Sequence, residues 1–299
     1  PQLELAYKEL PKDINTVGLW HMNENAANTC TGGVNDVCDA SGNVNDGAFN
    51  GNATHTTSSK LGASATTLDG TGDYIDLGSG TANFTNNFTI ESWVKFNTVS
   101  SQQRILTYRP ATGDANEVRL GVADTTSGKI YATVIHSSGS ATGYKDYEGN
   151  TTLSTGTWYH VAATWDGTNL KVYLNGSEDT PYNKVSDGSV SLTDTTRNRN
   201  LGRSPADAGY LNGVLDEVRI SNIARSPEEI KLDAGRRPYG VYTSDVQNLG
   251  KDVSSINNLR WTENGVQTGD GETPYSTNGL VAQWNFNETS GTIAANAST

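Results

Sequence analysis

Apolar and polar residues alternate along several segments of the chain, with the two-residue period of a β-strand that buries one face. In residues 88–96, four apolar side chains fall on one face, and Thr89, Glu91 and Lys95 fall on the other. Similar runs predict strands at residues 65–68, 74–77, 117–122, 129–135, 158–165, 169–174 and 213–221. Eight or more short strands separated by turn residues predict an all-β fold, a two-sheet antiparallel sandwich of jelly-roll type.

Two local signals add a hairpin and a helix. Gly167 lies between two of the predicted strands and supplies the backbone freedom that a tight turn needs. Ser226 is a suitable N-cap, a proline follows it at the first helical position, and Glu229 completes a capping box. Because Gly235 offers a C-terminal stop, the sequence predicts one short helix at residues 227–234.

The composition narrows the range of partners. The chain has 33 acidic and 21 basic residues, a net charge of −12, which disfavours binding to nucleic acids or anionic membranes because both are negative. No apolar run approaches the length that spans a bilayer, so we expect no membrane insertion. Charged residues make up only 18% of the chain, which predicts a largely neutral, polar surface rich in Thr, Ser, Asn and Gly.

The two cysteines lie close together in the sequence. Cys30 and Cys38 flank a segment rich in Gly and Asn, and they can form a local disulfide in an oxidising compartment. Two free surface thiols are the alternative. A zinc site is disfavoured because no second Cys pair or spaced His pair accompanies them.

Seven short motifs follow one another between residues 16 and 235. They are GLWHMNE (18–24), DASGNVNDG (39–47), LDGTGDYI (68–75), FTIESWV (88–94), TWYHVAATWDG (157–167), LKVYLNG (170–176) and GVLDEVRI (213–220). In this order they resemble the laminin-G-like, concanavalin A-like lectin/glucanase jelly roll of secreted and cell-surface proteins. The resemblance implies two packed antiparallel sheets and says little about the cysteine loop or the residues after 235.

The resemblance also implies a calcium ion, because this family often binds calcium where loops meet at the edge of the sandwich. Calcium takes oxygen ligands in flexible geometry, and the segment 39–47 is rich in them. The implied ligands are Asp39, Asn43 and Asp216, followed by Glu24 and Asp46. The alternative is that Asp39 and Asn43 form Asx-turns and that Asp216 caps a strand end.

No pattern of a catalytic site is present in the sequence. Glucanases of this fold carry alternate acids on one strand, and no predicted strand has them. Asp216 and Glu217 are adjacent in a predicted strand, so we expect them to point to opposite faces. We interpret His160 as a packed strand residue, and the sequence predicts a protein without enzymatic activity.

Binding of a sugar is the leading interpretation. Sugar sites combine aromatic rings with hydrogen-bonding side chains, and loops carry most binding residues. The predicted ligand-binding residues, which we place on loops, are Tyr144, Tyr147, Arg197 and Arg199. Aromatic residues on strands are weaker candidates, because such rings usually pack in the core or on the sheet surface; these are Trp93, Tyr131, Trp165 and Tyr173.

Residues 279–288 (GLVAQWNFNE) echo residues 18–24 and predict the beginning of a second copy in a tandem repeat. The predicted divisions are an N-terminal extension (1–15), a laminin-G-like jelly roll (16–235), a small β linker module (236–278) and an incomplete repeat (279–299). An unpaired first strand exposes its backbone and apolar side chains, so it favours pairing with a neighbouring copy. The residues expected in this assembly are Leu280, Trp284 and Phe286, with residues 3–10 as the alternative.

Together these features predict a noncatalytic module of an extracellular or cell-surface repeat protein. Its expected function is adhesion or carbohydrate binding, with a glycan or another cell-surface ligand as the partner. The alternative is a structural subunit of an extracellular filament, assembled by β-strand exchange between copies.

Overall fold

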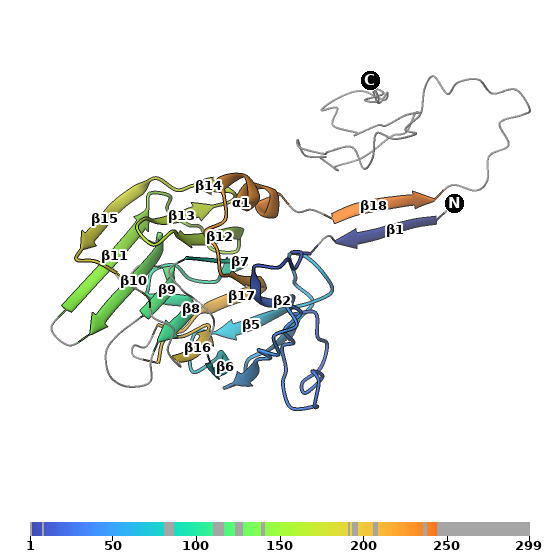
Figure 1. The fold of residues 1–299 in the computed structure, drawn as a ribbon. Helices are drawn as coiled ribbons and strands as arrows, with labels where there is room; N and C mark the ends of the chain where they lie inside the picture. Colours follow the sequence, from blue (N-terminus) through green and yellow to red (C-terminus); the bar gives the residue numbers. More distant parts are fainter. Residues whose placement is uncertain are drawn as a thin grey trace, which may run out of the picture. The chain divides into compact units, whose positions relative to one another are not determined.

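The computed structural model describes residues 2–7, 9–80, 87–109, 117–122, 128–138, 141–190, 192, 197–205, 209–235 and 238–243. Two antiparallel sheets packed face to face make up most of the described part, and one short helix lies beside them (Figure 1). The predicted all-β jelly-roll sandwich is therefore confirmed. It belongs to the compact unit Leu5–Val241.

The first sheet has eight strands. In spatial order they are β15 (Pro181–Asp187), β11 (Ala141–Gly149), β10 (Ile130–Ser138), β9 (Glu117–Val122), β8 (Gln103–Arg109), β16 (Arg197–Leu201), β6 (Tyr74–Gly80) and β3 (Ala48–Asn50). All neighbouring pairs are antiparallel.

The second sheet also has eight strands. Seven follow in the order β14 (Ser177–Glu178), β13 (Leu170–Leu174), β12 (Trp158–Trp165), β7 (Phe88–Phe96), β17 (Asn212–Ser221), β5 (Ala65–Asp69) and β4 (Thr54–Thr56). The eighth, β2 (Thr16–Trp20), pairs with the other end of β17. The helix α1 (Pro227–Ala234) buries Ile230 against Ala162 and Tyr173 on the outer face of this sheet.

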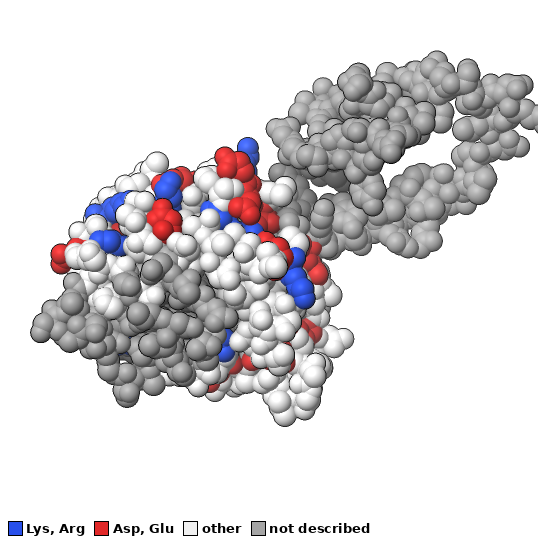
Figure 2. All heavy atoms as spheres, in the orientation of Figure 1, with Lys and Arg blue, Asp and Glu red and all other residues white. Residues whose placement is uncertain are grey.

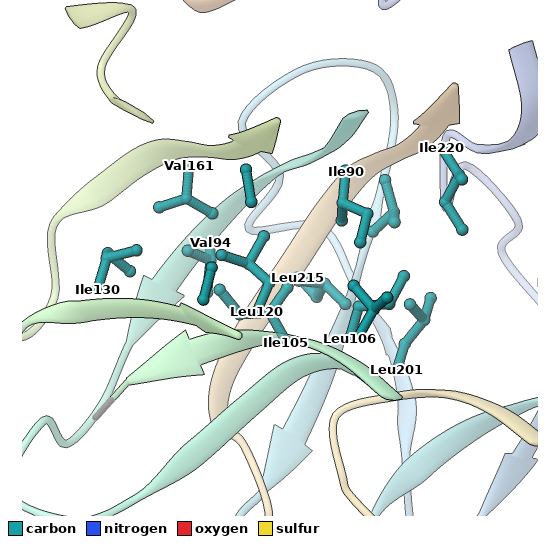
Figure 3. Packing of buried hydrophobic residues seen from close by; sticks show 14 of the residues in the cluster. Ile90, Val94, Ile105, Leu106, Leu120, Ile130, Val161, Leu201, Leu215 and Ile220 are labelled. Atoms are coloured by element: carbon teal, nitrogen blue, oxygen red, sulfur yellow. The ribbon is translucent and has the colours of Figure 1, made fainter. Parts of the chain in front are cut away.

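The core lies between the two sheets and is formed by the apolar side of each alternating strand. In Figure 3, Ile90 and Val94 of β7 lie among Leu106, Leu120 and Ile130 of the first sheet, and all five are essentially inaccessible to solvent. The sequence predicts this face correctly.

The opposite face of β7 is buried as well, which the alternation does not predict. Thr89, Glu91 and Trp93 are at most 5% exposed. The N-terminal segment and α1 cover this outer face, since Arg219 on it contacts the carbonyl of Pro11 and the carboxylate of Asp233. The polar side of β7 is therefore an internal layer rather than a solvated surface.

Uncharged side chains predominate on the face of the described part that Figure 2 displays, in line with the composition. Acidic and basic side chains are interspersed among them. Within the described part of the chain, no helix has the length and apolar character needed to cross a membrane.

Local predictions match the structure closely. The helix has the predicted bounds, and Ser226 and Glu229 form the reciprocal capping box, with the Ser226 N–H donating to Glu229 Oε2 at 2.8 Å. Gly167 takes a left-handed φ of 89° in the turn between β12 and β13.

Some elements and segments differ from the sequence interpretation. Tyr144, Tyr147, Arg197 and Arg199 lie on strands β11 and β16, not on loops. The predicted assembly residues Leu280, Trp284 and Phe286 lie outside the described residues, and the predicted domain boundaries stay predictions. At the other end of the chain, β1 (Gln2–Tyr7) pairs with β18 (Pro238–Thr243) of the same chain.

Replacing Ser226 with alanine is expected to lower the free energy of unfolding by about 1 kcal/mol, because the Glu229 N–H loses the side-chain acceptor of the helix cap. Urea unfolding followed by circular dichroism measures the change. Ser226→Thr keeps a hydroxyl acceptor and should remain within about 0.5 kcal/mol of the unmodified chain. Equal stability of the alanine and threonine variants would contradict the assigned cap.

Candidate functional site

A continuous row of polar side chains crosses the outer face of the first sheet. Residues paired in register lie on the same side of a sheet, and a chain of such pairs joins six strands from β11 to β6. We call these residues the polar row: Asp146, Thr133, Arg119, Thr107, Asn200 and Asp76. Since neighbouring strands lie about 4.8 Å apart, the row extends over roughly 24 Å.

The polar row lies on the face of the first sheet that points away from the core. Val134, Val118 and Leu201, each next to a row residue in sequence, are buried between the sheets. In the row itself, Thr133, Thr107 and Asn200 are at most 1% exposed, whereas Asp146, Arg119 and Asp76 are half-buried. The charged members therefore reach the surface, and the neutral members lie deeper.

One end of the row is organised around Asp146. Its Oδ1 accepts hydrogen bonds from the hydroxyl of Tyr131 at 2.9 Å and from the hydroxyl of Thr133. Burial and then the charge of Asp146 raise the pKa of Tyr131, so its hydroxyl stays protonated and remains a donor. The Tyr131 ring is half-buried, which gives this end an aromatic surface in a fixed orientation.

The centre of the row carries two arginines around one buried carboxylate. Arg119 binds Glu117 with two nitrogens, one of them at 2.8 Å, and Arg109 donates to the same carboxylate at 3.2 Å. The three groups leave one positive charge in excess. Opposite Arg119, the hydroxyl of Thr107 is buried and has no hydrogen-bond partner among the described residues.

The other end combines an amide, a carboxylate and a second tyrosine. The Asn200 side chain donates to Asp76 at 3.3 Å and accepts from Arg203 at 3.0 Å. The Arg203 guanidinium lies 3.4 Å above the centre of the Tyr74 ring, a cation–π contact. The face thus presents hydroxyl, amide, carboxylate and guanidinium groups next to aromatic rings at both ends.

The structure separates the four residues that the sequence predicts as ligand-binding. Tyr144 lies on the outer face, half-buried, two residues before Asp146. Tyr147 lies on the opposite side of β11 in the core, where its hydroxyl donates to the Asp179 carbonyl at 2.8 Å. These two positions fall on opposite faces because they are an odd number of residues apart in one strand.

The two arginines differ as well. Arg199 is 6% exposed and donates to Asn45 Oδ1 at 2.7 Å and to the Leu77 carbonyl at 2.8 Å, so it is a structural residue inside the sandwich. The side chain of Arg197 lies outside the described residues. Of the four strand aromatics, Trp93, Trp165 and Tyr173 are buried, and Tyr131 is half-buried on the face of the polar row.

Sequence reasoning did not find most of the polar row. The alternation in residues 117–122 and 129–135 places Arg119 and Thr133 on noncore faces, and this signal could have identified them. It could not have shown that the two face each other, because register depends on which strands pair.

The loop that resembles a calcium-binding element is held by its own hydrogen bonds. Asp39 Oδ1 accepts the N–H groups of Leu19 at 3.0 Å and Ser41 at 2.8 Å, and its Oδ2 accepts the N–H of Asn45 at 3.0 Å. Asn43 points its amide nitrogen at backbone carbonyls, including that of Val17 at 3.2 Å. Asp39 thus forms the Asx-type contacts of the alternative interpretation.

The other implied calcium ligands have separate partners. Asp46 accepts the N–H of Asp39 at 2.8 Å, and Glu24 accepts the N–H of Cys38 at 2.9 Å. Asp216 contacts a different loop, where its Oδ2 accepts the N–H groups of Lys60 and Leu61. Within the described residues, neither Asp39 nor Asp216 joins a group of three potential metal-ligating side chains.

As arranged, these residues do not fit a calcium ion, which needs about six to eight oxygen ligands in one place. Calcium binding stays a prediction, and nothing below depends on it.

Cys30 and Cys38 form a disulfide with their Cα atoms 5.2 Å apart, which closes the neighbouring loop.

Asp216 and Glu217 do not follow the strand alternation expected from the sequence. A β-bulge interrupts the pairing of β17 with β7 between Asp216 and Arg219, and Glu217 takes a left-handed φ of 50°. Both carboxyls are completely buried. Burial and the charge of the neighbouring Glu217 carboxylate raise the pKa of Asp216 to about 8.

Glu217 also belongs to a compact cluster with Glu9 and His21. His21 Nδ1 lies 2.9 Å and 3.0 Å from the two Glu217 carboxylate oxygens, and 4.0 Å from Glu9 Oε2. Burial alone would lower the pKa of His21, but the hydrogen bond to Glu217 and its charge outweigh burial and raise the pKa. Burial raises the pKa of Glu217.

A family comparison identifies the chain. The model of the concanavalin A-like lectin/glucanases superfamily matches residues 69–231, more than half of the sequence and all of the polar row. The chain belongs to this superfamily. The resemblance inferred from the seven motifs is thereby confirmed. No curated protein sequence matched the chain.

Solved structures with the same superfamily fold are similar over 74% of this chain. One is domain 4 of AbnA, a GH43 extracellular arabinanase from Geobacillus stearothermophilus, in complex with arabinotriose (TM-score 0.54, 20% identity, 98% of that chain covered). Another is the binding domain of Paraclostridial Mosquitocidal Protein 1 (TM-score 0.54, 13% identity, 52% covered). The match thus spans about half of the toxin domain. At these identities the likeness shows the fold alone.

Proposed function

We propose that this chain is a noncatalytic module that binds a glycan along the polar row. The observation that carries the proposal is the row itself: six hydrogen-bonding side chains in register across six strands, with Tyr131 at one end and Tyr74 at the other. Sugar rings stack on aromatic faces, and their hydroxyls need paired donors and acceptors.

The row is also organised in advance of binding. The Tyr131 hydroxyl donates a hydrogen bond to Asp146, and the Arg119 guanidinium donates to Glu117. Because these side chains are already ordered, binding a ligand costs less conformational entropy here than it would at a flexible loop. An extended oligosaccharide suits a site of this length better than a single sugar.

The arrangement of the acids favours binding over hydrolysis. A glycosidase needs two carboxyl groups about 5–10 Å apart that both reach the substrate. In the described structure, Glu117 is engaged through both oxygens by arginines. Asp216 and Glu217 are completely buried on the other sheet. We therefore propose no catalytic residue.

The disulfide and the structural neighbours support a place outside the cell. Disulfides persist in oxidising environments, and the Cys30–Cys38 bond is formed. One neighbour belongs to an extracellular arabinanase and holds arabinotriose, and another is the binding domain of a toxin. We propose that this chain is likewise a secreted or cell-surface module, and that adhesion through a surface glycan is its use. Filament assembly stays the alternative, since its residues lie outside the described ones.

The test is binding to a glycan array that includes arabinotriose, followed by titration calorimetry with the best ligand. Tyr131→Ala and Arg119→Ala are each expected to weaken binding about tenfold or more, since each removes a hydrogen-bonding group from the proposed site. Circular dichroism melts verify that each variant is folded.

Tyr182→Ala is the matched control. Tyr182 lies on β15 of the same sheet, is 64% exposed and is not part of the polar row, so its loss should leave the affinity unchanged. A glycan that binds all three variants equally would place the site elsewhere, and turnover of any glycan would overturn the noncatalytic assignment.

A further inference from the structure

A second group of side chains, on the opposite sheet from the polar row, has the composition of a metal site. Glu9 lies in the N-terminal segment, His21 follows β2, and Glu217 lies at the bulge of β17. One ligand atom from each, an imidazole nitrogen and two carboxylate oxygens, lies within 4.8 Å of the other two. The fold thus gathers three metal-ligating groups from three separate segments.

Two of the ligand-bearing side chains are oriented by further contacts. The Leu10 N–H donates to Glu217 Oε2 at 2.8 Å, and the Asn23 amide donates to Glu9 Oε1. Such supporting hydrogen bonds orient metal ligands and are a regular part of metal sites. The two carboxylates are therefore held in place without an ion.

Asp216 supplies an independent observation. Its Oδ2 accepts two backbone N–H groups, from Lys60 and Leu61, but its Oδ1 is buried and has no hydrogen-bond partner among the described residues. At the bulge of β17, Asp216 directly precedes Glu217 in the sequence. A buried oxygen without a donor is costly, and a cation beside it would relieve the cost.

We propose that Glu9, His21 and Glu217 form a binding site for a divalent transition-metal ion of the zinc class, with Asp216 beside it. The imidazole favours zinc or a similar ion over calcium and magnesium, which take oxygen ligands. Ligand atoms around a tetrahedral zinc ion lie roughly 3.3 Å apart, given bonds of about 2.0–2.1 Å. The present separations of 2.9 Å and 4.0 Å from His21 Nδ1 bracket that value.

Such an ion would act as a structural clamp. It would replace the proton shared by His21 and Glu217 and tie the N-terminal segment, through Glu9, to β2 and β17. The site is independent of the proposed glycan function, because the polar row lies on the other sheet.

The test compares thermal melts of the metal-stripped full chain with and without ZnCl2, together with titration calorimetry for stoichiometry. At a zinc concentration a hundred times Kd, we expect one ion per chain and a melting temperature raised by about 5–10 °C. CaCl2 and MgCl2 at the same concentration should cause no shift of the melting temperature that depends on His21 or Glu9.

His21→Gln and Glu9→Gln are expected to lose most of the zinc-dependent shift. Glu9 is one-third exposed, so its glutamine variant keeps the fold even where a change at His21 does not. His136→Gln alters a half-buried histidine on β10 and should keep the full shift. No shift in the unmodified chain, an equal shift in Glu9→Gln, or an equal calcium-dependent shift that His21→Gln removes would each overturn the proposal.

Discussion

Replacing Arg219 with methionine is expected to lower the free energy of unfolding by about 3–5 kcal/mol, a large part of the stability of an ordinary domain. Arg219 is 1% exposed on the outer face of the second sheet. It donates to Glu91 Oε1 at 2.6 Å and 2.8 Å, to the Asp233 carboxylate of α1, and to the Pro11 carbonyl at 2.9 Å.

The large effect follows from what the substitution leaves behind. Methionine fills a similar space, but Glu91 and Asp233 then lose a guanidinium and remain in a layer covered by α1 and the N-terminal segment. A buried carboxylate deprived of its cation carries the cost of desolvation without compensation. The loss should therefore loosen α1 as well as the sheet.

Lys171→Met is the matched control, because it removes a cation from an exposed pair. Lys171 and Glu178 lie 2.9 Å apart with side chains 41% and 37% exposed. Exposed pairs contribute less than about 1 kcal/mol. Urea unfolding of both variants at pH 7 gives the comparison. If Arg219→Met cost no more than Lys171→Met, the buried layer would not be a charged network.

Replacing Glu91 with glutamine is expected to make the chain less stable at pH 7, by about 3 kcal/mol, and to reduce its sensitivity to acid. Glu91 is completely buried. His160 Nε2 lies 3.3 Å from Glu91 Oε2, which is within ion-pair distance, but the two atoms are not aligned for a hydrogen bond. Burial alone would raise the pKa of Glu91, but the interactions with His160 and Arg219 outweigh it and lower the pKa from 4.5 to about 2.

The direction of the pH effect follows from this lowered pKa. A carboxyl that binds its proton less tightly in the folded state stabilises the fold above its unfolded pKa, and the contribution disappears as pH falls toward the folded value. For Glu91 that window runs from about pH 5 down to about pH 2. The stability difference between the unmodified chain and Glu91→Gln should therefore be largest at pH 7 and shrink steadily below pH 5.

Urea unfolding at pH 7, 5, 4 and 3 measures this difference. Other acids titrate in both proteins, so their contributions cancel when the two are subtracted. Glu178→Gln, at an exposed position, should show a small difference at every pH. A difference for Glu91→Gln that stayed constant from pH 7 to pH 3 would contradict the assigned ionisation of Glu91.

The features that the sequence predicted correctly are local ones. The helix needs only Ser226, Glu229 and the residues between them, because a capping box closes within one turn. The strands β9 and β12 were predicted with their observed bounds because alternation of apolar residues is visible within a few positions. The superfamily could be recognised because several of its motifs lie on strands of this kind, among them β7, β12 and β17.

Residues of β11 and β16 were placed on loops, because strands were recognised by their local alternation of apolar residues. Their sequences, ATGYKDYEG and RNRNL, have little apolar alternation. They form strands because β10, β8 and β6 offer them paired backbone partners. The burial of the polar side of β7 could not be predicted from the strand itself, because α1 and the N-terminal segment, which are distant in sequence, cover it.

The sequence by itself therefore determined which residues form eight of the strands, on which face of these strands the apolar residues lie, and which superfamily the chain belongs to. Only the tertiary structure decided that Asp76, Thr107 and Asn200 share one row, and that Glu9, His21 and Glu217 meet. The physical reason is that alternation fixes the side on which a residue lies, whereas its neighbour across the sheet depends on register and on bulges between distant segments.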